Sequence, residues 1–166
     1  GLFRHLPRGL VSWLDSPGLL RKAAARAGMT SPKDLAEVTL SVLQGEEGNQ
    51  HRELDRLADW LTAEKPDVIL LSNGLLIGLA RSLAERTKAR VFCFLQGEDT
   101  YLDSLPNGDR ERAWKAFRDR CADVEGFLSV SHYFTTLMVD RLKLDPGRVQ
   151  TIYPGIELEG YREPSP

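Results

Sequence analysis

Residues 96–99 read Gln-Gly-Glu-Asp and place four chemically useful groups next to one another. The amide of Gln96 both donates and accepts hydrogen bonds, and Gly97 lets a ligand approach the backbone closely. The carboxylates of Glu98 and Asp99 could accept hydrogen bonds from hydroxyl groups or exchange a proton. Both are therefore candidate catalytic residues, although either one could instead cap a short helix that follows.

A second polar stretch, GEEGNQHREL, occupies residues 45–54. Its asparagine, glutamine, histidine and carboxylate side chains together could hydrogen-bond a polyhydroxyl ligand, while His51 and Arg52 could equally be solvated. The same composition is also typical of a turn between two helices. Both interpretations stay open from these residues alone.

The elements that must position these groups change in character along the chain. Residues 2–64 show helical periods, with one helix opening at Ser31-Pro32 and running to about Leu43. A second helix over residues 50–63 is expected to bury one stripe: Leu54, Leu57, Trp60 and Leu61.

From residue 67 onward, apolar runs alternate with helical segments. Four strands are predicted, at residues 67–71, 90–95, 126–130 and 148–152. Helices are predicted at residues 75–86, 113–122 and 132–142. The first of these is long enough to cross over, so the first two strands should be parallel neighbours. The fold class is α/β, a three-layer Rossmann-like parallel sheet of about four strands with a helical N-terminal segment.

The carboxyl ends of parallel strands meet at one edge, where ligands bind in such sheets. The segments that follow the predicted strands contain Asn73 (SNG), Gln96 (QGED), Ser131 (SVSH) and Gly155 (YPG). Each has a structural interpretation as well, because asparagine favours turns, serine caps helices and Pro-Gly interrupts them. Their gathering on one edge favours a binding site there.

Composition excludes several classes of function. The 166 residues have a net charge of −2 with acidic and basic residues spread along the chain, so no basic face indicates a nucleic-acid partner. The two cysteines and three histidines lack metal-ligand spacing, and we expect no metal. No stretch is long enough for a transmembrane span, and we expect a cytoplasmic protein.

The segments KPDVILLSNGLLIGLARSLAERTKARVFCFLQGED and FLSVSHYFTTLMVDRLKLDPGRVQTIYPGIELEGY resemble the N-terminal domain of GT-B glycosyltransferases of the retaining family 4 group. The resemblance implies an acceptor-binding domain at residues 65–161, with the helical segment 1–64 packed on the sheet. It implies acceptor contacts by Gly48, Asn49, Gln50, Asn73, Gln96, Gly97 and Ser131, with Gly155 on the hinge or donor side. The turn at residues 45–50 should then face the same crevice as QGED.

Three departures from the family pattern bear on function. Many relatives carry a histidine where this chain has Gln96. The family's opening strand and glycine-rich loop are not found in residues 1–64, and the donor domain with its paired glutamates is not found after residue 161. The chain resembles an internal piece of the enzyme, with residues 162–166 leading toward the donor domain.

The resemblance implies transfer of a sugar from a nucleotide-sugar to a sugar or lipid-linked acceptor, without a metal and with peripheral membrane contact compatible with the sequence. A non-catalytic half-Rossmann binding module is the alternative. A flavodoxin-like nucleotide binder is disfavoured because no phosphate-binding glycine loop is present.

Overall fold

The computed structural model describes residues 32–157. The expectations for the first 31 residues, and for the linker at residues 162–166, lie outside the described part of the chain. Within it, helices come first and strands alternate with helices thereafter. The larger elements are α3 (Pro32–Gln44), α4 (His51–Glu64), β1 (Val68–Leu71), α5 (Ala80–Thr87), β2 (Arg90–Leu95), α6 (Glu98–Asp103), α7 (Asn107–Arg120), β3 (Gly126–Ser129), α8 (His132–Leu142) and β4 (Val149–Thr151).

Short 3₁₀ helices fill four connections: η2 (Gly45–Glu47), η3 (Gly74–Leu79), η4 (Cys121–Asp123) and η5 (Pro146–Arg148). The predicted helix at residues 75–86 is therefore two elements, η3 followed by α5. The predicted strands agree with the observed ones to within one residue at each end, because apolar runs bounded by proline, glycine or charge mark them clearly.

The four strands form one parallel sheet in the order β1-β2-β3-β4. Ile69 pairs with Val91, Cys93 with Phe127, and Ser129 with Thr151. The α/β class and the parallel pairing of the first two strands are confirmed.

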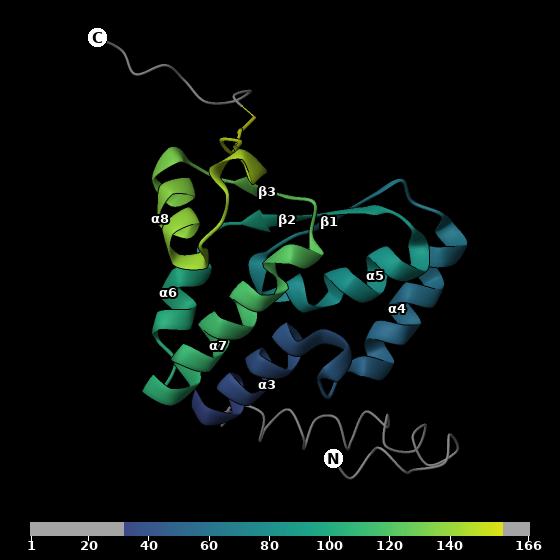
Figure 1. Cartoon of the computed structure of the whole chain (residues 1–166), viewed down its shortest axis with the longest axis horizontal. Coiled ribbons are helices and arrows are strands. Elements are labelled where there is room, and N and C mark those ends of the chain that lie inside the picture. The colour runs from purple at the N-terminus through teal and green to yellow at the C-terminus, as the bar shows by residue number, and fades with distance from the viewer. Residues whose placement is uncertain (1–31, 158–166) are drawn as a thin grey trace.

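All helices of the described chain lie on the same side of the sheet (Figure 1). Right-handed crossovers that always step in the same direction place every connecting helix on one face, which explains this arrangement. The helices η3, α5, α7 and α8 form the layer next to the strands, and α3 and α4 pack outside them (Figure 1). The three layers are therefore sheet, inner helices and outer helices.

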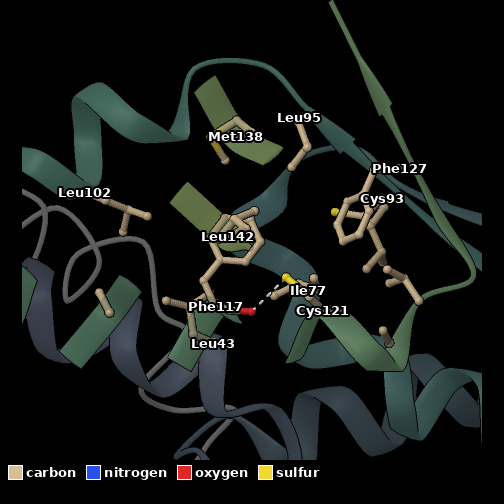
Figure 2. Packing of buried hydrophobic residues seen from close by; sticks show 14 of the residues in the cluster. Leu43, Ile77, Cys93, Leu95, Leu102, Phe117, Cys121, Phe127, Met138 and Leu142 are labelled. Carbon is tan, nitrogen blue, oxygen red and sulfur yellow. Dashed lines mark hydrogen bonds between the residues drawn. The ribbon is translucent and has the colours of Figure 1, made fainter. Parts of the chain in front are cut away.

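One hydrophobic core joins the sheet to both helical layers. On the helix side of the sheet, Cys93, Leu95 and Phe127 are fully or almost fully buried, and Phe117 of α7, Met138 and Leu142 of α8 pack close to them (Figure 2). The outer helices contribute Leu43 and Leu54 to the same cluster. Residues 32–64 thus pack on the inner helices rather than directly on the sheet, where the helical segment was expected.

Among the described residues, no helix covers the opposite face of the sheet (Figure 1). Val68 and Leu70 of β1 are 53% and 50% exposed, and Phe92, Phe94 and Leu128 are partly exposed on the same face. The buried stripe of α4 also differs from the prediction at one residue. Trp60 is 58% exposed, while Ala58 is fully buried, because the helix turns its smaller residue toward α5.

Candidate functional site

Two loops meet at the carboxyl edge of β1 and β2. One is Ser72-Asn73-Gly74 and the other is Gln96-Gly97, which leads into α6. The register pairs Leu71 with Cys93, so the two loops leave the sheet side by side. The sequence predicted this meeting, and the parallel sheet produces it.

Glu98 is the structural centre of this edge. Its side chain is only 3% exposed, and its carboxylate accepts hydrogen bonds from three backbone N–H groups. The donors are Gly74 N at 2.7 Å, Gln96 N at 2.9 Å and Gly97 N at 3.1 Å. Buried charge requires such partners, and here they tie the loop after β1 to the loop after β2. In this geometry Glu98 is a positioning residue; its predicted catalytic role stays a prediction.

Glycine at residue 74 is required by this close approach. A Cβ added to Gly74 would lie 2.4 Å from Cζ of Phe117 and 3.2 Å from Cγ of Glu98. Both neighbours are buried, so neither can move aside freely. Gly97 is needed for a different reason: its φ of 126° lies in the region that side chains rarely adopt.

Gln96 and Asp99 are two of the polar side chains that this edge presents to solvent. Gln96 is exposed, and its Nε2 donates to Ser72 O at 2.7 Å, a second link between the loops. Asp99 is partly exposed in the first turn of α6. Within the described chain, no hydrogen bond holds its carboxylate. Of the two predicted catalytic carboxylates, only Asp99 is therefore free to meet a ligand.

Asn73 and Ser131 act as helix caps. Asn73 Oδ1 accepts from Leu75 N at 2.7 Å and starts η3, while Ser131 Oγ accepts from Phe134 N at 3.2 Å and starts α8. Both side chains remain partly exposed at the edge. Their predicted ligand contacts stay predictions, but their capping function explains why these residue types occur there.

The end of β4 adds aromatic groups that the sequence analysis did not single out. The ring of His132 meets that of Tyr153 edge to face at 5.6 Å, and His132 Nδ1 lies 3.2 Å from Thr151 Oγ1. Tyr133 is 79% exposed beside them, and an open hollow of about 640 Å³ runs along α8 from this point. In the sequence, the position of Tyr153 directly after a predicted strand could have indicated this aromatic group. Gly155 is exposed two residues further on.

The turn at residues 45–50 does not lie where it was expected. Gly45 packs against the backbone of Gly78, and Glu46 pairs with Arg120 at 2.8 Å, at the end of α7 that leads into β3. α3 explains the shift: Thr39 contacts Tyr101 of α6 at 2.6 Å, and the helix then runs away from the QGED edge toward η2 (Figure 1). The expectation that this turn faces the QGED crevice is wrong.

The polar groups of that turn serve the turn itself. The hydroxyl of Ser41 accepts from Asn49 N at 2.6 Å and donates to Oε1 of Gln50, and Gly48 is buried against α3. Proximity therefore lends no support to acceptor contacts by Gly48, Asn49 and Gln50.

Other chemistries find little support in the described residues. Burial raises the pKa of the Cys121 thiol to about 12, and it raises the pKa of Cys93 further, so both thiols are poor nucleophiles. Between residues 32 and 157, no group of three or more His, Cys, Asp or Glu side chains could hold a metal ion. None of the described helices combines the length and the apolarity needed to cross a bilayer.

Comparison with known protein families identifies the family to which the chain belongs. The family model described as Glycosyltransferase Family 4 matches residues 24–159, which is most of the chain. The protein belongs to this glycosyltransferase family, in agreement with the resemblance seen in the sequence. No curated protein matches significantly. No solved structure does so either.

Proposed function

We propose that this chain is the acceptor-binding half of a glycosyltransferase that uses a nucleotide-sugar donor. Membership of the family supports sugar transfer in general. The observation that supports the finer assignment is the edge at which Glu98 joins two loops, with Gln96 exposed and Asp99 partly exposed beside it. An acceptor sugar needs such hydrogen-bonding groups on a rigid support.

Asp99 is the residue best placed to receive a proton from the acceptor hydroxyl. Its carboxylate is accessible, unlike that of Glu98. We propose that Gln96 binds the acceptor beside it and that Ser131 and Asn73 contribute through their exposed atoms. Gly155 follows β4 and is assigned to the donor-facing side.

The remaining features of the reaction follow from the family resemblance. We propose that donor and acceptor react without a metal ion and that the reaction takes place in the cytoplasm, with the acceptor either a free sugar or a lipid-linked one. Two buried, unpaired cysteines are compatible with a reducing compartment. The donor would be bound by a second domain.

Transfer assays on the natural gene product test this proposal. Incubation with labelled nucleotide-sugars and a panel of sugar acceptors should yield a glycosylated product. Gln96→Ala should lower kcat/KM about five- to a hundred-fold, because a buried acceptor hydroxyl would lose its partner. The pH profile should be unchanged, since an amide does not titrate.

Gln150→Ala is the matched control, because Gln150 is an exposed glutamine on β4 that pairs within the sheet away from this edge. Transfer that is equally insensitive to both substitutions would contradict an acceptor site at Gln96. Absence of any transfer, combined with sugar binding, would favour the non-catalytic binding module.

A further inference from the structure

The carboxyl edge of this sheet is built to receive an uncharged ligand. We infer that the acceptor bound here presents neutral hydroxyl groups, and that sugars carrying a carboxylate or a phosphate at the bound ring are excluded. This inference rests on the proposed function, because it concerns the acceptor of that same site. The first supporting observation is that backbone N–H groups at this edge already donate to a side chain of the protein.

Loops at this position commonly bind anions through free backbone N–H groups. Three of those groups are already used here. Gly74 N, Gln96 N and Gly97 N all donate to the carboxylate of Glu98. That carboxylate occupies the place of an anionic ligand, and it is 3% exposed, so solvent does not displace it.

One donor at the start of η3 and one at the start of α8 are used in the same way. Leu75 N donates to Asn73 Oδ1, and Phe134 N donates to Ser131 Oγ. Side-chain oxygens thus satisfy donors that could otherwise face a phosphate or carboxylate.

The orientation of Gln96 supports the same conclusion. Its Nε2 donates to the carbonyl oxygen of Ser72, which can only accept, so the amide cannot be turned around without losing this bond. Oε1 is then the atom left for a ligand. An amide oxygen accepts hydrogen bonds from hydroxyl groups and offers nothing to an anion.

The charge of the edge adds repulsion. Residues 72–75, 96–100, 129–133 and 152–157 contain no lysine or arginine, but they include Glu98, Asp99 and Glu157. Arg141 interacts electrostatically with Asp99, yet its guanidinium donates to Asp103 at 2.7 Å. An anionic sugar at Gln96 would therefore face carboxylates without a free cation among the described residues of these loops.

Binding measured by NMR on the labelled 166-residue chain tests the inference. The probes are glucose, galactose and mannose, each compared with its uronic acid and its 6-phosphate. At least one neutral sugar should shift the amide signals of Gln96, Gly97 and Asp99. The matching uronic acid and 6-phosphate should have a Kd at least about tenfold higher, as expected for a like charge near two carboxylates.

The outcomes separate the two proposals. An anionic sugar that shifts the same signals with equal or higher affinity overturns the inference and leaves an acceptor site at this edge intact. Failure of every probe, neutral or charged, to shift these signals overturns the site itself and the inference with it. Gln96→Ala should abolish the shifts, whereas Gln150→Ala should preserve them.

Glu98→Ala tests the reason for the selectivity. Removal of the carboxylate frees the N–H groups of Gly74, Gln96 and Gly97. Inorganic phosphate should then shift their signals, whereas it should leave those of the unsubstituted chain in place. If this variant does not fold, Glu98→Gln is used instead, because it retains the side-chain volume and removes the charge. It should reduce the ratio of the affinity for neutral sugars to the affinity for anionic sugars. An unchanged preference in a folded Glu98→Gln chain would contradict a role for this carboxylate.

Discussion

Two adjacent carboxylates in the QGED segment have different environments. Glu98 turns inward and accepts three backbone hydrogen bonds, whereas Asp99 remains partly exposed at the start of α6. Alternation along the first turn of a helix is enough to separate them, because consecutive helical side chains point about 100° apart. The same residue type thus serves the fold at one position and is available for chemistry at the next.

Amide substitutions distinguish the two carboxylates. Asp99→Asn should lower turnover of the natural gene product and remove the acidic limb of its pH–rate profile, because the amide cannot accept the acceptor proton. Urea unfolding should change by no more than about 0.5 kcal/mol. Glu98→Gln should instead lower the free energy of unfolding by about 1–3 kcal/mol, because an amide NH₂ would face backbone donors.

Asp55→Asn on α4 is the control for Asp99, since Asp55 is exposed and belongs to a surface ion pair with Arg86. It should leave turnover and the pH profile unaltered. Full activity of Asp99→Asn with an unaltered profile would remove Asp99 from the catalytic candidates.

At the scale of elements, a single carboxylate joins three helices. Asp103 at the end of α6 accepts from Trp114 Nε1 of α7 at 3.0 Å and from Arg141 of α8 at 2.7 Å. The guanidinium of Arg141 also lies over the ring of Trp114, 5.1 Å from its centroid. These contacts set the position of α6, and α6 in turn carries Glu98 and Asp99.

The ionisation of Asp103 makes this junction depend on pH. The hydrogen bond from Arg141 is the main cause that lowers the pKa of Asp103. A carboxyl group with a lowered folded-state pKa stabilises the protein fully above its unfolded pKa of about 3.9, and this stabilisation is lost as the pH falls below that value.

Asp103→Asn should therefore destabilise the chain by about 0.5–1 kcal/mol near pH 7, a range reduced for the partial exposure of the pair. The difference from the unsubstituted chain should shrink as the pH falls through the lowered folded-state pKa of Asp103. Urea unfolding at several pH values measures both effects. Asp119→Asn, which breaks the exposed Lys115 pair on α7, should cost no more than about 0.5 kcal/mol. A stability deficit of Asp103→Asn that does not shrink as the pH is lowered below about 3.9 would contradict this explanation.

At the scale of the whole molecule, the open face of the sheet is the least usual feature. Parallel sheets normally have helices on both faces, yet here Val68 and Leu70 are about half exposed and β1 pairs with a strand on one side only within the described sheet. An apolar face next to an unpaired strand edge favours association of one chain with another.

The isolated 166-residue chain should therefore self-associate as its concentration rises. Leu70→Lys should shift this association to higher concentration, because a charge on the apolar face opposes its burial. Static light scattering over a concentration series measures the effect. Trp60→Lys is the control, since Trp60 is a similarly exposed apolar residue on α4. A monomer at every concentration in the unsubstituted chain would show that neither the face nor the edge drives association.

The sequence by itself determined the succession of elements and the edge at which the loops meet. Apolar runs such as residues 90–95 can form strands because they are bounded by charge, glycine or proline, and a crossover helix between them requires parallel pairing. Given parallel strands, the segments that contain Asn73 and Gln96 must emerge at the same edge. These inferences depend on the local residue pattern, which the sequence shows directly, and on the fixed handedness of crossover connections between parallel strands.

The tertiary structure alone decided what each polar residue does there. Glu98 is buried because Gly74, 24 residues earlier, donates to it, and a contact of that length depends on the register of β1 and β2. The turn at residues 45–50 lies away from the edge because α3 is held by α7 and η3, and no local pattern encodes the direction of a helix in an outer layer. Long-range packing therefore buried Glu98 and left the neighbouring Gln96 and Asp99 accessible to solvent.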